Sequence, residues 1–323
     1  MSDLAPIVLF VYNRPWHTRQ TLEALSKNHL ADKSRLIIFE DGAKEGSTEE
    51  QLQSRKEVHH LIREKKWCKE VEIIERKKNF GLSNSIISGV NEIVNKYGKI
   101  IVLENDIVTS KGFLKYMNEA LTLYQDKENV MYVSGFMYPV KAKLPETFFC
   151  NATSTWGWGT WNRAWKKFNS DSTFLHKALL ESLRMSEFTM NDKNYLLSLL
   201  ERNVAVEKKF SDAPQDIIHS KNDWCWDICW YTTLFLLNGL SLHPRQSLVR
   251  NIGHDETGAH CKESWWSQIY KNQKSADHIT VDLIELINNK KANSAVENFH
   301  VSLNNPPLIV RAKEKINLLI KKK

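Results

Sequence analysis

The feature that most constrains this fold is the regular alternation of short apolar runs with helical segments in the first third of the chain. The apolar runs occupy residues 7–12, 36–39, 71–75 and 99–104. Segments with helical spacing, at 17–28, 47–66 and 82–97, separate them. Apolar runs without polar alternation are typical of strands buried on both faces of a parallel sheet. The alternation therefore predicts an α/β fold with a doubly wound, mostly parallel sheet.

Polar residues follow each of these predicted strands. Three groups are conspicuous: Asn13-Arg14-Pro15, Asp41-Gly42 and Glu104-Asn105-Asp106. Ligands of such sheets bind at the carboxyl ends of the strands, so we expect the three groups to converge on one rim. Lys77 and Lys78 follow the third strand and would add positive charge there, although each taken singly fits a solvated surface lysine better.

Beyond residue 150 the pattern changes, because tryptophan becomes dense and helical segments dominate to about residue 240. We expect an α/β half over 1–150 and a helical, tryptophan-rich half of the same domain over 151–300. Residues 301–323 form a predicted basic amphipathic C-terminal helix, with one apolar stripe and lysines around it in 306–323. This helix fits peripheral contact with an anionic membrane or packing on the protein body equally well.

Composition narrows the class of protein. The 323 residues include no run of about 18 apolar residues, and no basic segment precedes the first apolar stretch, so we expect a cytoplasmic protein. Five cysteines without a CxxC pair predict reduced thiols. The net charge of +7 suits an anionic partner. Nucleic acid ranks below a nucleotide because the sequence lacks a dense basic stripe.

The acids after the fourth strand have two interpretations. Mg²⁺ and Mn²⁺ prefer oxygen ligands and are commonly held by one or two carboxylates together with substrate phosphates, so Asp106 fits a metal ligand. Acids are also common at exposed turns, and spacing alone favours that simpler interpretation.

A second group lies in residues 221–260. Asp227 stands between Trp224, Trp226 and Trp230, a setting that would raise the pKa of its carboxyl group and suit a general base. It also fits an acid at a helix N-terminus, although Asp223 precedes the apolar run and fits the capping position better. Further along, His254 and His260 fit metal ligands and solvent-facing loop histidines about equally.

The segment 155–168 contains four tryptophans and two glycines. Trp156 and Trp158, together with Trp226, have ring faces on which the apolar face of a sugar stacks. Core packing and stacking of nucleic-acid bases are the alternatives.

Taken in order, these segments resemble a known family. They are YNRP, FEDG, KNFGLSNSIISGVN, IIVLENDIVTSKGFLKYMNEAL, GWGTWNRAW and WDICWYTTLFLLNGLSLHP followed by LVRNIGHDETGAH. Across residues 5–262 the chain resembles bacterial family 2-like glycosyltransferases of the GT-A type, which have a Rossmann-like sheet. It is more distantly similar to N-acetylglucosaminyltransferase I.

The resemblance implies an inverting, metal-dependent transfer of a sugar from a nucleotide-sugar, with a UDP-sugar preferred. The acceptor would be a glycan or lipid-linked acceptor in the biosynthesis of a surface polysaccharide or lipopolysaccharide. The implied roles are donor binding for Tyr12, Arg14, Asp41, Glu104 and Asn105, metal binding for Asp106 and His260, and catalysis by Asp227 as the base. Lys78 is added to the donor-binding residues because of its position after the third strand.

One position departs from the family pattern. The middle residue of the acidic motif is Asn105 rather than an acid, which removes one negative charge while keeping hydrogen-bonding capacity. The alternative function is therefore a noncatalytic nucleotide- or carbohydrate-binding protein that kept the GT-A-like fold.

Overall fold

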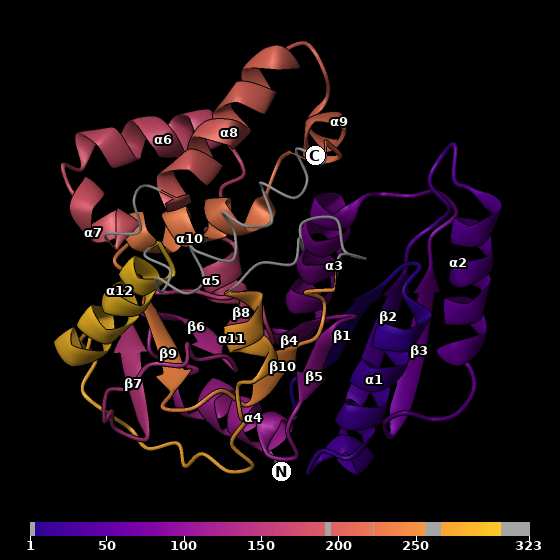
Figure 1. Ribbon diagram of the computed structural model, residues 1–323, viewed down its shortest axis with the longest axis horizontal. Coiled ribbons are helices and arrows are strands. Elements are labelled where there is room, and N and C mark those ends of the chain that lie inside the picture. Colours follow the sequence, from indigo (N-terminus) through magenta and orange to yellow (C-terminus); the bar gives the residue numbers. More distant parts are fainter. Residues whose placement is uncertain (1–3, 191–194, 222, 256–265, 305–323) are drawn as a thin grey trace, which may run out of the picture.

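The protein is built around one eight-stranded sheet (Figure 1). The structure, a computed structural model, describes residues 4–190, 195–221, 223–255 and 266–304. The strands follow the order β3 (Glu70–Glu75), β2 (Arg35–Glu40), β1 (Ile7–Val11), β4 (Lys99–Glu104), β8 (Trp158–Trp161), β6 (Val130–Ser134), β9 (Leu240–Pro244) and β7 (Thr147–Cys150). Pairing is parallel from β3 through β4 and between β6 and β9. The predicted α/β class with a mostly parallel sheet is confirmed.

Side chains of the central strands alternate between two hydrophobic layers. Ile7, Leu9 and Val11 of β1 join one core cluster, and Val8 and Phe10 join the other. The first cluster also contains residues of α1 (Pro15–Ser26), α2 (Glu49–Leu61) and α4 (Phe113–Leu123). The second contains residues of α3 (Leu82–Tyr97) and of α10 (Trp226–Leu236). Helices therefore cover both faces of the sheet, as double winding requires.

The first three helices begin within two residues of their predicted positions. Thr48 accepts a hydrogen bond from the Gln51 amide, and the Gln51 side chain accepts one from the Thr48 amide, which completes a capping box at the start of α2. The helix ends at Leu61, earlier than the predicted limit of residue 66. At α3, Gly81 has φ 76° at the N-cap, a conformation that glycine adopts without steric cost.

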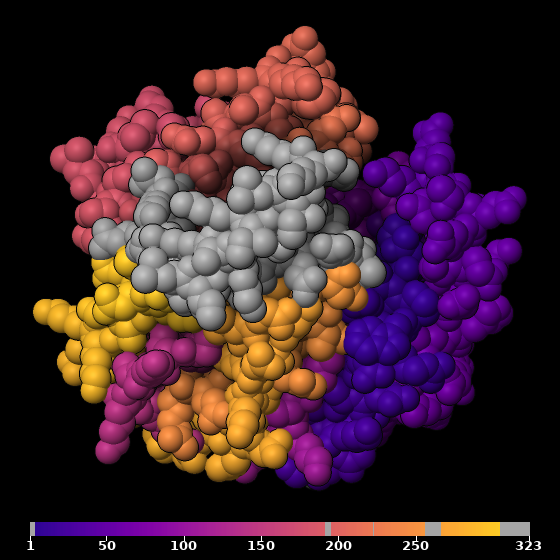
Figure 2. All heavy atoms as spheres, viewed as in Figure 1, coloured from indigo at the N-terminus to yellow at the C-terminus, as the bar shows by residue number. Residues whose placement is uncertain are grey.

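The tryptophan-rich half supplies further helices and shares the same sheet. These helices are α5 (Asn162–Trp165), α6 (Ser172–Glu181), α7 (Met185–Thr189), α8 (Tyr195–Lys209) and α9 (Gln215–His219), followed by α10. Helices α6 to α9 form the upper part of the molecule as seen in Figure 2. Because β8 and β9 lie between or beside strands of the first half, the two halves are joined through one sheet.

A small ribbon, which the sequence does not predict, lies directly after β4. Residues following Asp106 form β5 (Ile107–Thr109), which pairs antiparallel with β10 (Val249–Asn251). Helix α4 therefore begins only at Phe113, after this ribbon strand. The ribbon brings residues 252–255 next to the end of β4.

The last described elements are α11 (Ser267–Lys271) and α12 (Lys290–Asn304), which packs beside β7. A short 3₁₀ turn, Ala31–Lys33, precedes β2. The predicted amphipathic segment 306–323 and His260 lie outside the described residues. Among the helices that are described, none combines the length and the apolar character needed to cross a membrane.

Candidate active site

Polar side chains from three segments meet where β1 and β4 end. Arg14, which follows β1, donates from Nη1 to Asp106 Oδ2 at 2.7 Å. Arg14 Nη2 lies 3.1 Å from Asp255 Oδ1 and 2.8 Å from His17 Nε2. The side chains of Arg14 and Asp106 are 13% and 14% exposed, so this ion pair is largely shielded from water. The ends of β1 and β4 thus meet at one rim, as the sequence predicts.

Gly253 closes this group from the β10 side. A Cβ atom on residue 253 would lie 2.1 Å from Asp106 Oδ2, which is far inside van der Waals contact. The Gly253 carbonyl also accepts from Arg14 Nη2 at 3.4 Å. Only a residue without a side chain allows the backbone to approach the carboxylate this closely.

Glu104, the last residue of β4, links the Asp106 group to Asp227. The pKa of Glu104 is raised to about 8, chiefly by burial and also by the charges of Asp106 and Asp227, while Arg14 opposes the rise. Charges influence one another over several ångströms in a poorly solvated region, so the Glu104 carboxyl is affected by both neighbours. Two residues predicted for different roles, Asp106 and Asp227, therefore belong to one electrostatic site.

Asp227 occupies the first turn of α10, where its Oδ1 accepts from the Ile228 amide at 2.9 Å. Cys225 is the N-cap residue and Asp223 is exposed, so the expectation that Asp223 caps this helix is wrong. Trp224, Trp226 and Trp230 are buried in the core. Among the described residues, none of these three indole rings lines the pocket onto which Asp227 opens.

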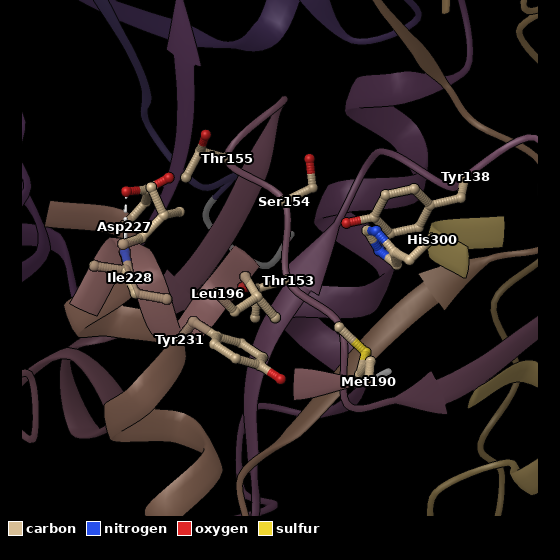
Figure 3. A pocket seen from close by; sticks show the side chains of 11 residues that line it. Tyr138, Thr153, Ser154, Thr155, Met190, Leu196, Asp227, Ile228, Tyr231 and His300 are labelled. Atoms are coloured by element: carbon tan, nitrogen blue, oxygen red, sulfur yellow. Dashed lines mark hydrogen bonds between the residues drawn. The ribbon is translucent and has the colours of Figure 1, made fainter. Parts of the chain in front are cut away.

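That pocket is lined by residues of α8, α10 and α12, by Met190 at the end of α7, and by residues 153–155 (Figure 3). Asp227 lies at one end, and Tyr138 and His300 lie together at the other. Hydroxyl groups and aliphatic side chains make up most of the wall: Tyr138, Thr153, Ser154, Thr155, Met190, Leu196, Leu199, Ile228 and Tyr231. Burial lowers the pKa of His300 to about 4, so its ring is neutral at pH 7. The wall thus combines hydrogen-bonding groups with apolar surface, with Asp227 as its charged member among the described residues.

His254 lies in an aromatic cage beside Asp106. It is 5% exposed, so the solvent-facing interpretation of this histidine is wrong. Its ring centroid is 5.4 Å from that of Trp156, 5.4 Å from that of Trp266 and 5.9 Å from that of Tyr270. Within the described part of the chain, neither ring nitrogen has a hydrogen-bond partner. Burial lowers the pKa of His254, and the charge of Asp106 acts in the opposite direction.

Asp41 is a buried residue, whereas a residue that contacts the nucleotide directly is expected to be exposed at the rim. Its carboxylate is buried and accepts hydrogen bonds from the amides of Gly42, Phe80 and Gly81 and from the Ser85 hydroxyl. Burial raises the pKa of Asp41, and these hydrogen bonds oppose the rise. The side chain therefore shapes the loop before α3 and positions the rim.

The other predicted donor-binding residues lie along the rim with fewer contacts. The Tyr12 hydroxyl accepts from the Lys44 amide at 3.2 Å. The Asn105 carbonyl accepts from the Thr21 hydroxyl at 2.9 Å, which anchors the acidic turn to α1. Lys77 and Lys78 are exposed, which fits their simpler interpretation as surface lysines.

The three tryptophans proposed to stack on a sugar have unequal positions. Trp158 is 0% exposed and Trp226 is 3% exposed, and their rings stack on each other with centroids 5.6 Å apart. These two rings are core residues and offer no open face to a sugar, so the core alternative fits them. Trp156 is partly exposed and contacts the His254 ring.

Three members of the site were missed in the sequence: His17, Gly253 and Asp255. Asp255 Oδ2 lies 2.8 Å from His17 Nε2, and burial is the main cause of a lowered pKa of His17. For Gly253 and Asp255, the only signal in the sequence is the series glycine, histidine, aspartate after the last predicted strand.

A separate group of possible ligands lies between α2, β2 and β3. Ligand atoms of Glu40, His59 and Glu75 lie within 4.8 Å of one another. Arg63 bridges both carboxylates, at 2.8 Å from Glu40 Oε2 and 3.2 Å from Glu75 Oε2. Because a guanidinium group already compensates these acids, we assign the group a structural role in attaching α2 to the sheet.

Comparison with known proteins gives similarities in fold alone. No protein-family model matches the chain, and no curated protein matches it in sequence. Among solved structures, it is similar to the mannosyltransferase PcManGT from Pyrobaculum calidifontis in complex with GDP-Man and Mn²⁺, with 12% identity, a TM-score of 0.39, and coverage of 72% of this chain and 74% of that chain.

It is also similar to S. aureus TarS, with 14% identity and a TM-score of 0.28 over 45% of this chain and 23% of that one. For a UDP-glucose pyrophosphorylase complexed with UDP-glucose, the identity is 12% and the TM-score 0.29, over 51% of this chain and 79% of that one. The chain thus aligns with less than a quarter of the length of TarS. At these identities and TM-scores the likenesses assign no activity.

Proposed function

We propose that the protein is an inverting GT-A-type glycosyltransferase that moves a sugar from a nucleotide-sugar to a hydroxyl group of an acceptor. The observation that supports this proposal is an electrostatic link between two features. Asp227 opens onto a pocket walled by hydroxyl and aliphatic groups, and Glu104 connects it electrostatically to the Asp106–Arg14 pair. A base that opens onto a pocket with hydrogen-bonding groups and a charged group at the strand ends are parts that such a transfer needs.

The residues present fit a divalent metal ion, Mn²⁺ or Mg²⁺. Asp106 supplies carboxylate oxygen, and His254 has two buried ring nitrogens without partners among the described residues. A buried histidine nitrogen of this kind calls for an explanation, and a metal ion near a carboxylate supplies one. When bound, the ion would neutralise charge on the nucleoside diphosphate as it leaves.

The remaining chemistry is assigned to side chains of this chain. Asp227 takes the proton from the acceptor hydroxyl, whose oxygen forms a bond to the anomeric carbon. The bond from that carbon to the diphosphate oxygen breaks, and the electron pair leaves with the diphosphate. Attack opposite the leaving group inverts the anomeric centre. Arg14 stabilises the negative charge that develops on the diphosphate.

We propose the finer assignments on the sequence resemblance. These are a family 2-like enzyme with a distant relation to N-acetylglucosaminyltransferase I, a UDP-sugar donor, and a hexosyl or N-acetylhexosaminyl group. The acceptor would be a glycan or lipid-linked acceptor of a surface polysaccharide or lipopolysaccharide. We place the reaction on the cytoplasmic side, with residues 306–323 in peripheral contact with an anionic membrane. Asn105 is retained as a donor-binding residue.

A screen of nucleotide-sugars for release of the nucleoside diphosphate, with and without Mn²⁺, tests the proposal. We expect one donor to release its diphosphate in a Mn²⁺-dependent way, at a rate that an acceptor glycan increases. Tight nucleotide binding without any turnover across the screen would contradict transfer and favour the noncatalytic binding protein. That alternative has one specific observation in its favour, because Arg14 already compensates the charge of Asp106.

A further inference from the structure

Asp106 is already paired with a cation from this chain. Arg14 Nη1 lies 2.7 Å from Asp106 Oδ2, and the two side chains are largely buried. A divalent ion at the same carboxylate would meet a guanidinium charge at close range in a poorly solvated site, where like charges repel strongly. The ion and Arg14 therefore compete for the charge of Asp106.

The second terminal nitrogen of the Arg14 guanidinium has partners of its own, independent of Asp106. Arg14 Nη2 is held separately, by Asp255 Oδ1 at 3.1 Å, by the Gly253 carbonyl at 3.4 Å and near His17 Nε2 at 2.8 Å. The residue precedes the first turn of α1 and is attached to a short loop after β1. A planar guanidinium group forms two parallel hydrogen bonds with phosphate oxygens, so a diphosphate at this rim would be a strong competing partner.

We propose that Arg14 acts as a charge latch on Asp106: it suppresses metal binding to the free protein and moves to the diphosphate when the donor binds, which releases Asp106 for the ion. This inference rests on the proposed function and specifies how the same site is regulated. It predicts that metal and nucleotide bind with positive coupling and that a substantial part of this coupling depends on Arg14.

A second arginine, Arg19, lies on α1, the helix that Arg14 precedes. It pairs with Glu64 at 2.8 Å, but these side chains are 43% and 47% exposed and lie outside the Asp106 group. Arg19→Gln is therefore a matched control, since it removes the same charge from a nearby position of the chain.

The experiment is a titration of Mn²⁺ into the full-length protein, with free Mn²⁺ followed by electron paramagnetic resonance, in the absence and presence of UDP. We expect Arg14→Gln to bind Mn²⁺ about tenfold more tightly than the wild type without UDP, and UDP to increase its affinity less than that of the wild type. Arg14→Lys keeps the positive charge, so its Mn²⁺ affinity should stay low. Arg19→Gln should behave as the wild type.

Equal Mn²⁺ affinity of wild type and Arg14→Gln without UDP would overturn the latch, as would wild-type Mn²⁺ binding that UDP leaves unchanged. The comparison of wild-type Mn²⁺ binding with and without UDP needs no variant, so it tests the latch even if Arg14→Gln fails to fold. Thermal unfolding shows whether that variant is folded. These outcomes are measured without turnover. They are therefore separate from the failure of the proposed function, which would show as no diphosphate release from any nucleotide-sugar.

Discussion

Among single residues, Gly253 shows most clearly how the site depends on contacts between distant parts of the chain. It has no side chain to contribute, yet its backbone packs directly against the Asp106 carboxylate. The β5–β10 ribbon holds it there. The position of Asp106 is therefore determined by a residue almost half of the chain away.

We expect Gly253→Ala to displace the Asp106 carboxylate, because the new Cβ would lie 2.1 Å from Oδ2. Mn²⁺-dependent activity should fall by about tenfold or more, in keeping with the strong sensitivity of catalysis to small displacements. Gly46→Ala is the control for backbone strain alone, since residue 46 has φ +74°, where alanine is strained, but a Cβ there meets nothing within 4 Å, the Asp106 carboxylate included. Initial rates with saturating donor check the prediction, and equal rates for the two variants would contradict it.

For single residues, the sequence predicts where the acidic residues lie but not which side chains surround them. Glu104, Asp106 and Arg14 follow strands, and strand order alone places them on one rim. His17 and Asp255 could not be foreseen, because the pairing of β5 with β10 is a non-local contact between two three-residue strands. The sugar-stacking interpretation of Trp158 and Trp226 is wrong, because a sugar-binding surface and a core cluster can have the same density of tryptophan.

Among the structural elements, those with local signals were the most predictable. The strands β1 to β4 and the helices α1 to α3 follow from hydrophobic period, and the start of α2 follows from its capping box. The antiparallel strand β8, inserted between β4 and β6, has no such local signal. Its sequence, WGTW, is short and rich in glycine and tryptophan, and only burial in the finished sheet explains it.

The capping box of α2 offers a direct test of an element-level signal. Thr48→Ala removes the side-chain acceptor of the Gln51 amide at 3.2 Å, and we expect a loss of about 1 kcal/mol in the free energy of unfolding. Thr122→Ala, at an exposed position within α4, is the matched control and should be close to neutral. Denaturant unfolding measures both values, and an equal effect of the two changes would argue against the cap.

The core assignment of β8 can be tested in the same way. Trp158 is 0% exposed, so Trp158→Ala should lower the free energy of unfolding by about 3–5 kcal/mol through loss of buried surface and formation of a cavity. Trp16 is 59% exposed, and Trp16→Ala should cost less than about 1 kcal/mol. A small cost at Trp158, accompanied by a raised KM for a sugar substrate, would restore the sugar-stacking role.

In the whole molecule, one sheet connects the α/β half to the tryptophan-rich half. The candidate site lies along this connection, because Glu104 and Asp106 come from the first half and Asp227 from the second. Stability of the sheet and geometry of the site are therefore coupled. Buried neutral histidines near the far strands should make that stability depend on pH.

His243 in β9 is 0% exposed, and burial lowers its pKa to about 4. The unfolded chain has the ordinary histidine pKa of about 6.5, so it binds more protons than the folded chain between these values. Stability should therefore be fully present above pH 6.5 and fall as the pH drops towards 4, by up to about 1.4 kcal/mol per pH unit for this residue.

Denaturant unfolding at pH 7, 6 and 5 measures this slope. We expect His243→Gln to reduce it, because glutamine does not take up a proton in this range. His29→Gln changes an exposed histidine and should leave the slope as in the wild type. A slope that is the same in all three proteins would show that His243 does not titrate as its burial requires.

The most direct measurement of the central claim is the rate of sugar transfer by Asp227→Asn, with the donor that the nucleotide-sugar screen identifies. We predict a folded protein that binds this donor normally and transfers sugar about 10²- to 10⁴-fold more slowly than the wild type, because the base is lost. Asp223→Asn, at an exposed position just before α10, should keep the wild-type rate. Transfer by Asp227→Asn at the wild-type rate would contradict the account.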